Sequence, residues 1–208
     1  MRGFRHLGAV VTIAGLLTGS AATAASAATS QPARAQGAAV HVRGGTTAVT
    51  TAPGVAPALL KNGIVPFATW PGAQSVLFAQ SGPAARFTFP VVGGRVTVSP
   101  LGGTIRHAGG ILFVNVKNGR SIEVSRFTIN LARAGLTGMV NGNPKARVPL
   151  FRLDLARAKL TAGKHVITAS GIGLKLTSVA ARALNAALGS KLFSAGLSLG
   201  TARTLLRI

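Results

Sequence analysis

Few side chains in this sequence can act as acids, bases or nucleophiles. The only side-chain carboxylates are those of Glu123 and Asp154, and catalytic acid pairs usually meet in a cleft among other polar groups. The alternation of neighbouring residues turns both acids outward, which suits surface ion pairs with neighbouring arginines. We therefore expect surface ion pairs at these two positions and no acid–base pair.

The segment Gly196–Gly200 matches the G-x-S-x-G pattern of a nucleophile elbow, with Ser198 at its centre. That elbow needs a parallel α/β sheet, and its acid and histidine come later in the chain. Only eight residues follow Gly200, and none of them is Asp, Glu or His. We interpret the pattern as a β turn between Ala195 and Thr201, and we expect no esterase and no enzyme of another class.

Metal-binding and phosphate-binding patterns are also missing. The chain has no cysteine, and its later histidines, His41, His107 and His165, do not show H-x-x-x-H spacing. The glycine pairs lack the G-K-[ST] continuation of a phosphate-binding loop. We therefore expect no metal site, and we interpret the glycine pairs as turns.

His107 is the one candidate binding residue that we single out. It lies in the stretch LGGTIRHAGGILFVNV, where Ile105 and His107 share the parity of one short strand and so face the same way. If Ile105 is in the core, His107 lies at the rim of that core, beside a turn at Gly109–Gly110. Two interpretations remain open: a structural histidine that caps turn carbonyls, or a residue that holds a ligand.

The charge of the chain is strongly positive. Lys and Arg number 23 against two acidic residues, and the formal net charge is +21. Such a chain attracts polyanions, among them nucleic acid, anionic cell-wall polymers and acidic lipid surfaces. The basic residues are spread without a block of five, so a merely solubilising surface is the alternative. Base stacking usually needs exposed aromatic rings; Trp70 is the only tryptophan and tyrosine is absent, so we expect no specific nucleic-acid partner.

The N-terminal segment predicts export. Residues 1–27 combine Arg2 and Arg5, an apolar run over Leu7–Leu17 and an A-x-A site at Ala25–Ala27. This is the pattern of a secretory signal peptide, and the run is shorter than the 20 or so apolar residues that span a bilayer. A second cleavage point at 33–35 remains an alternative.

The rest of the chain divides into a leader and one domain. Residues 28–45 are small and polar, which predicts a flexible leader. Residues 46–208 are long enough for a single domain with its own core. We expect the mature protein to be secreted, either free or held at the cell envelope by non-covalent contacts.

Short segments of alternating apolar and polar residues follow Thr46, which is typical of antiparallel strands with one buried face. Gly93–Gly94 predicts a tight hairpin, and Asn118–Gly119 predicts a hairpin with a type I′ turn. The apolar parity shifts after Val124, which predicts a bulge near Ser125–Arg126. Such spacing suggests a sandwich or a barrel. We predict an all-β fold, an antiparallel β-sandwich of about ten strands with one or two short helices.

Two segments predict these helices. Thr177 or Ser178 can cap the segment VAARALNAAL, and Gly189 follows where a C-terminal glycine belongs. The segment Pro57–Gly63 has proline at its start and glycine after its end, which is the usual asymmetry of helix termini.

Three motifs together resemble the HtaA-type domains of secreted and cell-surface proteins of actinobacteria. They are FPVVGG at 89–94, GTIRHAGGIL at 103–112 and LTSVAARAL at 176–184, within a resemblance that covers Phe87 to Ala202. The resemblance implies an antiparallel β-sandwich with small helices that binds haem through a tyrosine with a histidine nearby. His107 is the position that corresponds to this histidine neighbourhood, whereas the sequence has no tyrosine.

Three hypotheses for function follow. We expect an exported, non-catalytic binding or structural module at the cell envelope, which its basic surface keeps near anionic polymers or the membrane surface. The first alternative is an HtaA-like haem-binding or haem-transport protein, with His107 as a haem ligand or as a donor beside it. The second alternative is a polycationic nucleic-acid-binding or antimicrobial protein, whose affinity would depend on salt and on no single residue.

Overall fold

The computed structural model describes residues 38–79 and 82–208. The predicted signal peptide, residues 1–27, lies outside the described residues, and so does the predicted leader up to residue 37. The leader prediction is wrong for its last residues, because a strand begins at Val40. Val42 is almost fully buried and pairs with Gly94, so residues 40–45 belong to the folded domain.

Thirteen strands and two helices make up the described part of the chain. The first seven strands are β1 (Val40–Val42), β2 (Gly44–Thr51), β3 (Ile64–Thr69), β4 (Ala73–Ala79), β5 (Gly82–Thr97), β6 (Gly102–His107) and β7 (Gly110–Asn115). The remaining strands are β8 (Arg120–Asn130), β9 (Gly135–Val140), β10 (Asn143–Asp154), β11 (Lys159–Ala162), β12 (Val166–Leu176) and β13 (Ser198–Arg207). The helices are α1 (Val55–Lys61) and α2 (Ser178–Leu188).

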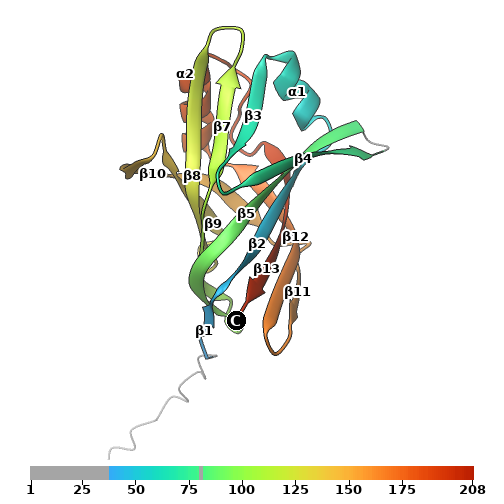
Figure 1. Ribbon diagram of the computed structural model, residues 1–208, viewed down its shortest axis with the longest axis vertical. Helices are drawn as coiled ribbons and strands as arrows, with labels where there is room; N and C mark the ends of the chain where they lie inside the picture. The colour runs from blue at the N-terminus through green and yellow to red at the C-terminus, as the bar shows by residue number, and fades with distance from the viewer. Residues whose placement is uncertain (1–37, 80–81) are drawn as a thin grey trace, which may run out of the picture. The chain divides into compact units, whose positions relative to one another are not determined.

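Eight of these strands close into an antiparallel barrel (Figure 1). Neighbours are hydrogen-bonded in the order β5–β2–β13–β12–β10–β9–β8–β6, and β6 pairs again with β5 to complete the ring. Strands β1, β3, β4, β7 and β11 pair outside this ring. The all-β class and the two short helices are confirmed, whereas the predicted sandwich of two sheets is corrected to a closed barrel.

Closure of the barrel depends on β5, which is 16 residues long and runs on through Gly93–Gly94. The hairpin predicted at this glycine pair is therefore wrong. Both glycines have positive φ, 146° and 156°, and a Cβ on Gly94 would overlap the carbonyl oxygen of Thr104 on β6. Glycine thus lets β6 approach β5 closely, next to a register shift between Val91 and Gly93.

Two Asn-Gly turns join consecutive strands. The hairpin between β7 and β8 is confirmed at Asn118–Gly119, but in this pair only Gly119 has positive φ, so the turn is not of type I′. Asn141 and Gly142, between β9 and β10, have φ of 48° and 68°. The two positive φ values expected of a type I′ turn therefore occur at this second pair.

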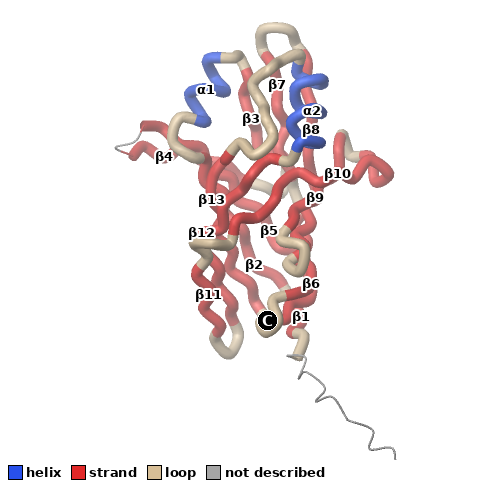
Figure 2. Tube along the Cα trace, turned by 180° about the vertical axis from the view of Figure 1, so that it is seen from behind, coloured by secondary structure: helices blue, strands red, loops and turns tan. Residues whose placement is uncertain are grey.

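The two helices lie at one end of the barrel, and β11 lies at the other end in both views (Figures 1 and 2). Helix α2 has the predicted termini, since Thr177 Oγ1 accepts a hydrogen bond from the Ala180 N–H at 3.1 Å and Gly189 follows with φ 61°. Helix α1 begins at Val55, two residues before the proline expected to start it. No helix in residues 38–79 or 82–208 is long and apolar enough to cross a membrane.

Aromatic side chains pack inside the barrel and between the sheet and the helical end. The rings of Phe89 and Phe127 meet edge to face at 5.0 Å between centroids, and those of Phe113 and Phe193 do so at 6.5 Å. All four side chains are at least 90% buried, and edge-to-face pairs of this kind add stability beyond the burial itself. Phe193, which follows α2, thereby packs the helical end onto the sheet.

Candidate functional site

His107 is buried in the barrel interior and only 4% of its surface is exposed. Its Nε2 lies 2.7 Å from Thr47 Oγ1, and Thr47 Oγ1 lies 3.0 Å from Thr204 Oγ1. Its Nδ1 lies 3.4 Å from the carbonyl oxygen of Phe127. Burial lowers the pKa of His107 to about 4, and the Phe127 carbonyl opposes this only in part, so the ring is neutral at pH 7.

One arrangement of protons satisfies this whole network. The carbonyl of Phe127 can only accept, so Nδ1–H donates to it and Nε2 is left as an acceptor. The Thr47 hydroxyl then donates to Nε2, and the Thr204 hydroxyl donates to Thr47. Within the described residues, every buried side-chain nitrogen and oxygen has a partner. Both ring nitrogens of His107 are therefore engaged by the protein itself.

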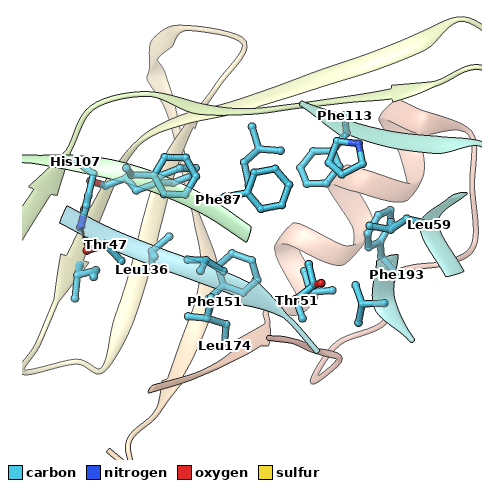
Figure 3. Close-up of a pocket in the computed structure, with 18 residues that line it drawn as sticks. Thr47, Thr51, Leu59, Phe87, His107, Phe113, Leu136, Phe151, Leu174 and Phe193 are labelled. Atoms are coloured by element: carbon cyan, nitrogen blue, oxygen red, sulfur yellow. Dashed lines mark hydrogen bonds between the residues drawn. The ribbon is translucent and has the colours of Figure 1, made fainter. Parts of the chain in front are cut away.

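An apolar cavity of about 90 Å³ adjoins this network on the helical side. Figure 3 shows His107 and Thr47 at one end of the row of lining side chains, and Leu59, Phe113 and Phe193 at the other. His107 and two threonines are the polar side chains of the lining, and all its other residues are apolar. An apolar space of this size has room for a small apolar group.

A larger and open groove of about 550 Å³ lies on the other side of His107. We call it the arginine groove. Its lining residues are Thr69, Trp70, Pro71, Val92, Arg106, His107, Ala108, Gly109, Glu123, Ser125, Arg126, Thr128, Met139, Gly142 and Arg147. Three guanidinium groups and one carboxylate line it, and Trp70 at its edge is 92% exposed. Such a surface attracts anions and offers an aromatic face beside them.

The positions of Arg126 and Arg147 follow from the bulge in β8. The parity shift predicted there is confirmed, because the pairing of β8 with β9 shifts between Ser125 and Thr128, and Arg126 has φ 49°. Nη1 of Arg147 on β10 donates to the Arg126 carbonyl at 3.0 Å and contacts the hydroxyls of Thr128 and Thr137 at 3.3 Å. The bulge thus places the Arg126 carbonyl within reach of the Arg147 guanidinium, although the two residues are 21 positions apart, and both residues line the arginine groove.

The two acidic residues lie on different strands and have different partners. Glu123 lines the arginine groove and accepts a hydrogen bond from Thr69 Oγ1 at 2.9 Å. Asp154 forms an ion pair with Lys175 at 2.8 Å, and this ammonium lowers the pKa of the Asp154 carboxyl. The ion pair expected for Asp154 is present, but its partner is a lysine of β12 and not an arginine. The ion pair expected for Glu123 is absent among residues 38–79 and 82–208, where its carboxylate bonds Thr69 instead.

The other residues weighed in the sequence lie apart from the groove. Ser198 is exposed at the start of β13, opposite Lys175. His41 is exposed on β1, and His165 is exposed before β12. Among residues 38–79 and 82–208, no three His, Cys, Asp or Glu side chains gather as metal ligands would.

Sequence reasoning missed the arginine groove. Its three arginines, Arg106, Arg126 and Arg147, come from β6, β8 and β10 and are about 20 residues apart. No local motif joins them, since only the strand order places these segments around one opening. One sequence signal could have indicated part of the groove: the bulge predicted at Ser125–Arg126, because a bulge turns a strand residue such as Arg126 away from the face that simple alternation assigns to it.

Comparison with known proteins shows a similarity of fold to one solved domain. No protein-family model matches the chain, and no curated protein matches its sequence. Among solved structures, the C-terminal domain of HtaA from Corynebacterium glutamicum aligns with a TM-score of 0.54 at 14% identity, over 80% of this chain and 98% of that one. A domain-swapped dimer of a variant of that domain aligns with a TM-score of 0.47 at 17% identity, over 66% of this chain and 84% of that one. The chain therefore has an HtaA-type fold.

Proposed function

We propose that this chain is an exported, non-catalytic binding module of the cell envelope, and that the arginine groove binds the anionic groups of envelope polymers. The observation that carries the proposal is the meeting of Arg106, Arg126 and Arg147 at one opening with a single carboxylate. Guanidinium groups bind phosphates and carboxylates in a planar, two-pronged geometry. The carboxylate, Glu123, is engaged by Thr69.

The other charged side chains of the molecule also favour a polyanion as the partner. The described part of the chain contains a single ion pair, Lys175 with Asp154, so the basic side chains elsewhere in that part have no carboxylate within ion-pair distance. This excess attracts any polyanion over a distance of about 10 Å at ordinary salt. The arginine groove adds to this general attraction a guanidinium group in a fixed position, because three hydrogen bonds hold the side chain of Arg147.

The test is a binding measurement with inorganic polyphosphate as the polyanion, at rising salt. One variant carries Arg106→Gln, Arg126→Gln and Arg147→Gln. The control carries Arg86→Gln, Arg182→Gln and Arg203→Gln, which remove the same charge from exposed positions outside the groove. We expect the groove variant to bind about tenfold more weakly than the control at about 0.15 M salt. Equal losses in both variants would overturn the groove as the binding site.

Haem binding is the second candidate, and the described residues fit it only in part. The arginines of the groove suit the two carboxylates of haem, and Trp70 offers a ring face. The iron, however, needs an axial donor. Tyrosine is absent, and both nitrogens of His107 are already hydrogen-bonded within the barrel. The residues do not fit an iron-ligating site of the kind that the HtaA resemblance implies, and we assign no ligand.

A further inference from the structure

A second apolar cavity opens at the end of the barrel remote from the helices. We call it the distal cavity; it measures about 280 Å³ and is lined by residues of β5, β6, β8 and β10 to β13. It is separate from the arginine groove, and the two share no lining residue. Its lining consists of valine, leucine, isoleucine and alanine, with two threonines and one lysine as the exceptions.

One row of paired residues runs from the mouth of this cavity to its floor. Leu160 on β11 pairs with Ala169 on β12, Ala169 pairs with Thr204 on β13, and Thr204 pairs with Thr47 on β2. Thr204 is buried and its hydroxyl is bonded to Thr47, so the floor offers no free polar group. The methyl group of Ala169 leaves space in the middle of the row that a larger side chain would fill.

The mouth of the cavity is apolar and carries one charge. Val98 and Leu101 are each 40% exposed there, and Leu160 is 45% exposed. Covering such surface is favourable by about 25 cal/mol for each Å². Lys159 is the only charged residue in the lining, and it is exposed beside Leu160. An occupant with a hydrocarbon tail and an anionic head would satisfy both features.

We infer that the distal cavity binds a fatty acid, with its hydrocarbon tail against Ala169 and Ile105 and its carboxylate at Lys159. Small-molecule sites in proteins are concave, mostly apolar and supplied with a few polar groups that fix orientation, and the distal cavity has this composition. The inference does not depend on the arginine groove, so either proposal can fail without the other.

The experiment is a fluorescence titration of the purified chain with cis-parinaric acid, followed by displacement with dodecanoate. We expect one saturable site. Ala169→Leu should weaken binding more than tenfold because the added side chain occupies the cavity. Lys159→Gln should weaken dodecanoate binding several-fold and leave the Kd of dodecanol unchanged once the weaker binding of the probe is taken into account. Phe78→Ser is the control, because Phe78 is 87% exposed on β4 and is not part of the cavity lining.

Three results would overturn the inference: no saturable binding, equal binding by wild type and Ala169→Leu, or loss of binding in Phe78→Ser alone. The last would place the probe on the exposed β4 surface. Far-ultraviolet circular dichroism checks that Ala169→Leu is folded. If it is not, Leu160→Glu replaces it, because this half-exposed mouth position tolerates a charge and the carboxylate repels the fatty acid.

Discussion

The hydroxyl oxygen of Thr47 lies 2.7 Å from Nε2 of His107, although the two residues are 60 positions apart. The bond joins β2 to β6, the two strands that flank β5 in the barrel. It also extends to β13, since the same hydroxyl bonds Thr204. His107 lines both the arginine groove and the apolar cavity on the helical side, so this network forms part of the wall between them.

Replacing Thr47 with valine should destabilise the fold. Valine keeps the shape of threonine but leaves Nε2 of His107 and the Thr204 hydroxyl without their shared partner. A buried polar group that loses its partner costs about 1–3 kcal/mol, so we expect the free energy of unfolding to fall by about 2 kcal/mol or more. Urea denaturation at pH 7 measures it. Thr46→Val on the exposed face of the same strand is the control, and equal effects of the two substitutions would contradict the prediction.

Stability should fall as the solution is acidified from pH 6.5 toward pH 4. The pKa of His107 is about 4 in the folded chain, against 6.5 for an ordinary histidine. Between these values the unfolded chain binds more protons than the folded chain, so falling pH favours unfolding. A shift of this size corresponds to about 3 kcal/mol, and the loss is complete below pH 4.

The measurement is the urea midpoint at half-unit steps across this range. His107→Gln should lack most of the slope that the wild type has between pH 6.5 and 4. His165→Gln, which removes an exposed histidine, should keep it. A flat wild-type profile in this interval would show that His107 is not the buried neutral group described above.

Local features of the fold could be predicted because their causes are local. The cap at Thr177 and the glycine at Gly189 follow from the backbone groups that a helix end leaves unpaired. The bulge at Ser125–Arg126 follows from a change in apolar parity along one strand. Phe87 and Phe89 are buried, as their alternation with polar residues predicts.

Closure of the barrel could not be predicted from such patterns. It depends on β5 continuing through Gly93–Gly94 and pairing with β2 on one side and β6 on the other. A glycine pair between two alternating segments equally favours a hairpin, and only the long-range pairing decides between them. The arginine groove depends on the same pairing, because the strand order sets which arginines meet.

Substitution of Gly110 should disturb the junction of β7 with β8. A Cβ at this position would lie 2.5 Å from Ser125 Cβ and from the Val124 carbonyl oxygen, and 2.8 Å from Ser125 Cα. Much of this contact is with backbone, which cannot rotate away, so we expect Gly110→Ala to lower stability by about 2 kcal/mol or more.

Gly135, at the start of β9, provides a matched control for Gly110→Ala. A Cβ there would meet only the Arg133 carbonyl oxygen at 3.7 Å, an ordinary contact. Gly135→Ala should therefore change stability by no more than about 0.5 kcal/mol. Thermal unfolding of both variants tests the pair, and a similar melting temperature for the two would count against the close approach of β7 to β8.

Binding of haemin should depend on salt and not on His107. Haemin carries two carboxylates, so the basic chain should collect it at low ionic strength by general attraction. Because both nitrogens of His107 are bonded within the barrel, we expect a diffuse change in the Soret band, without a one-to-one end point. Raising the salt to about 0.5 M should remove most of it, because screening weakens attraction between exposed charges.

His107→Ala separates the two explanations of haemin binding. If the attraction is electrostatic, the titration of this variant should follow that of the wild type at low and at high salt. A sharp one-to-one Soret shift that survives high salt in the wild type and vanishes in His107→Ala would contradict the prediction. It would mean that the Thr47 bond opens to free Nε2 for the iron, and Thr47→Val, which removes that bond in advance, should then bind haemin more tightly than the wild type.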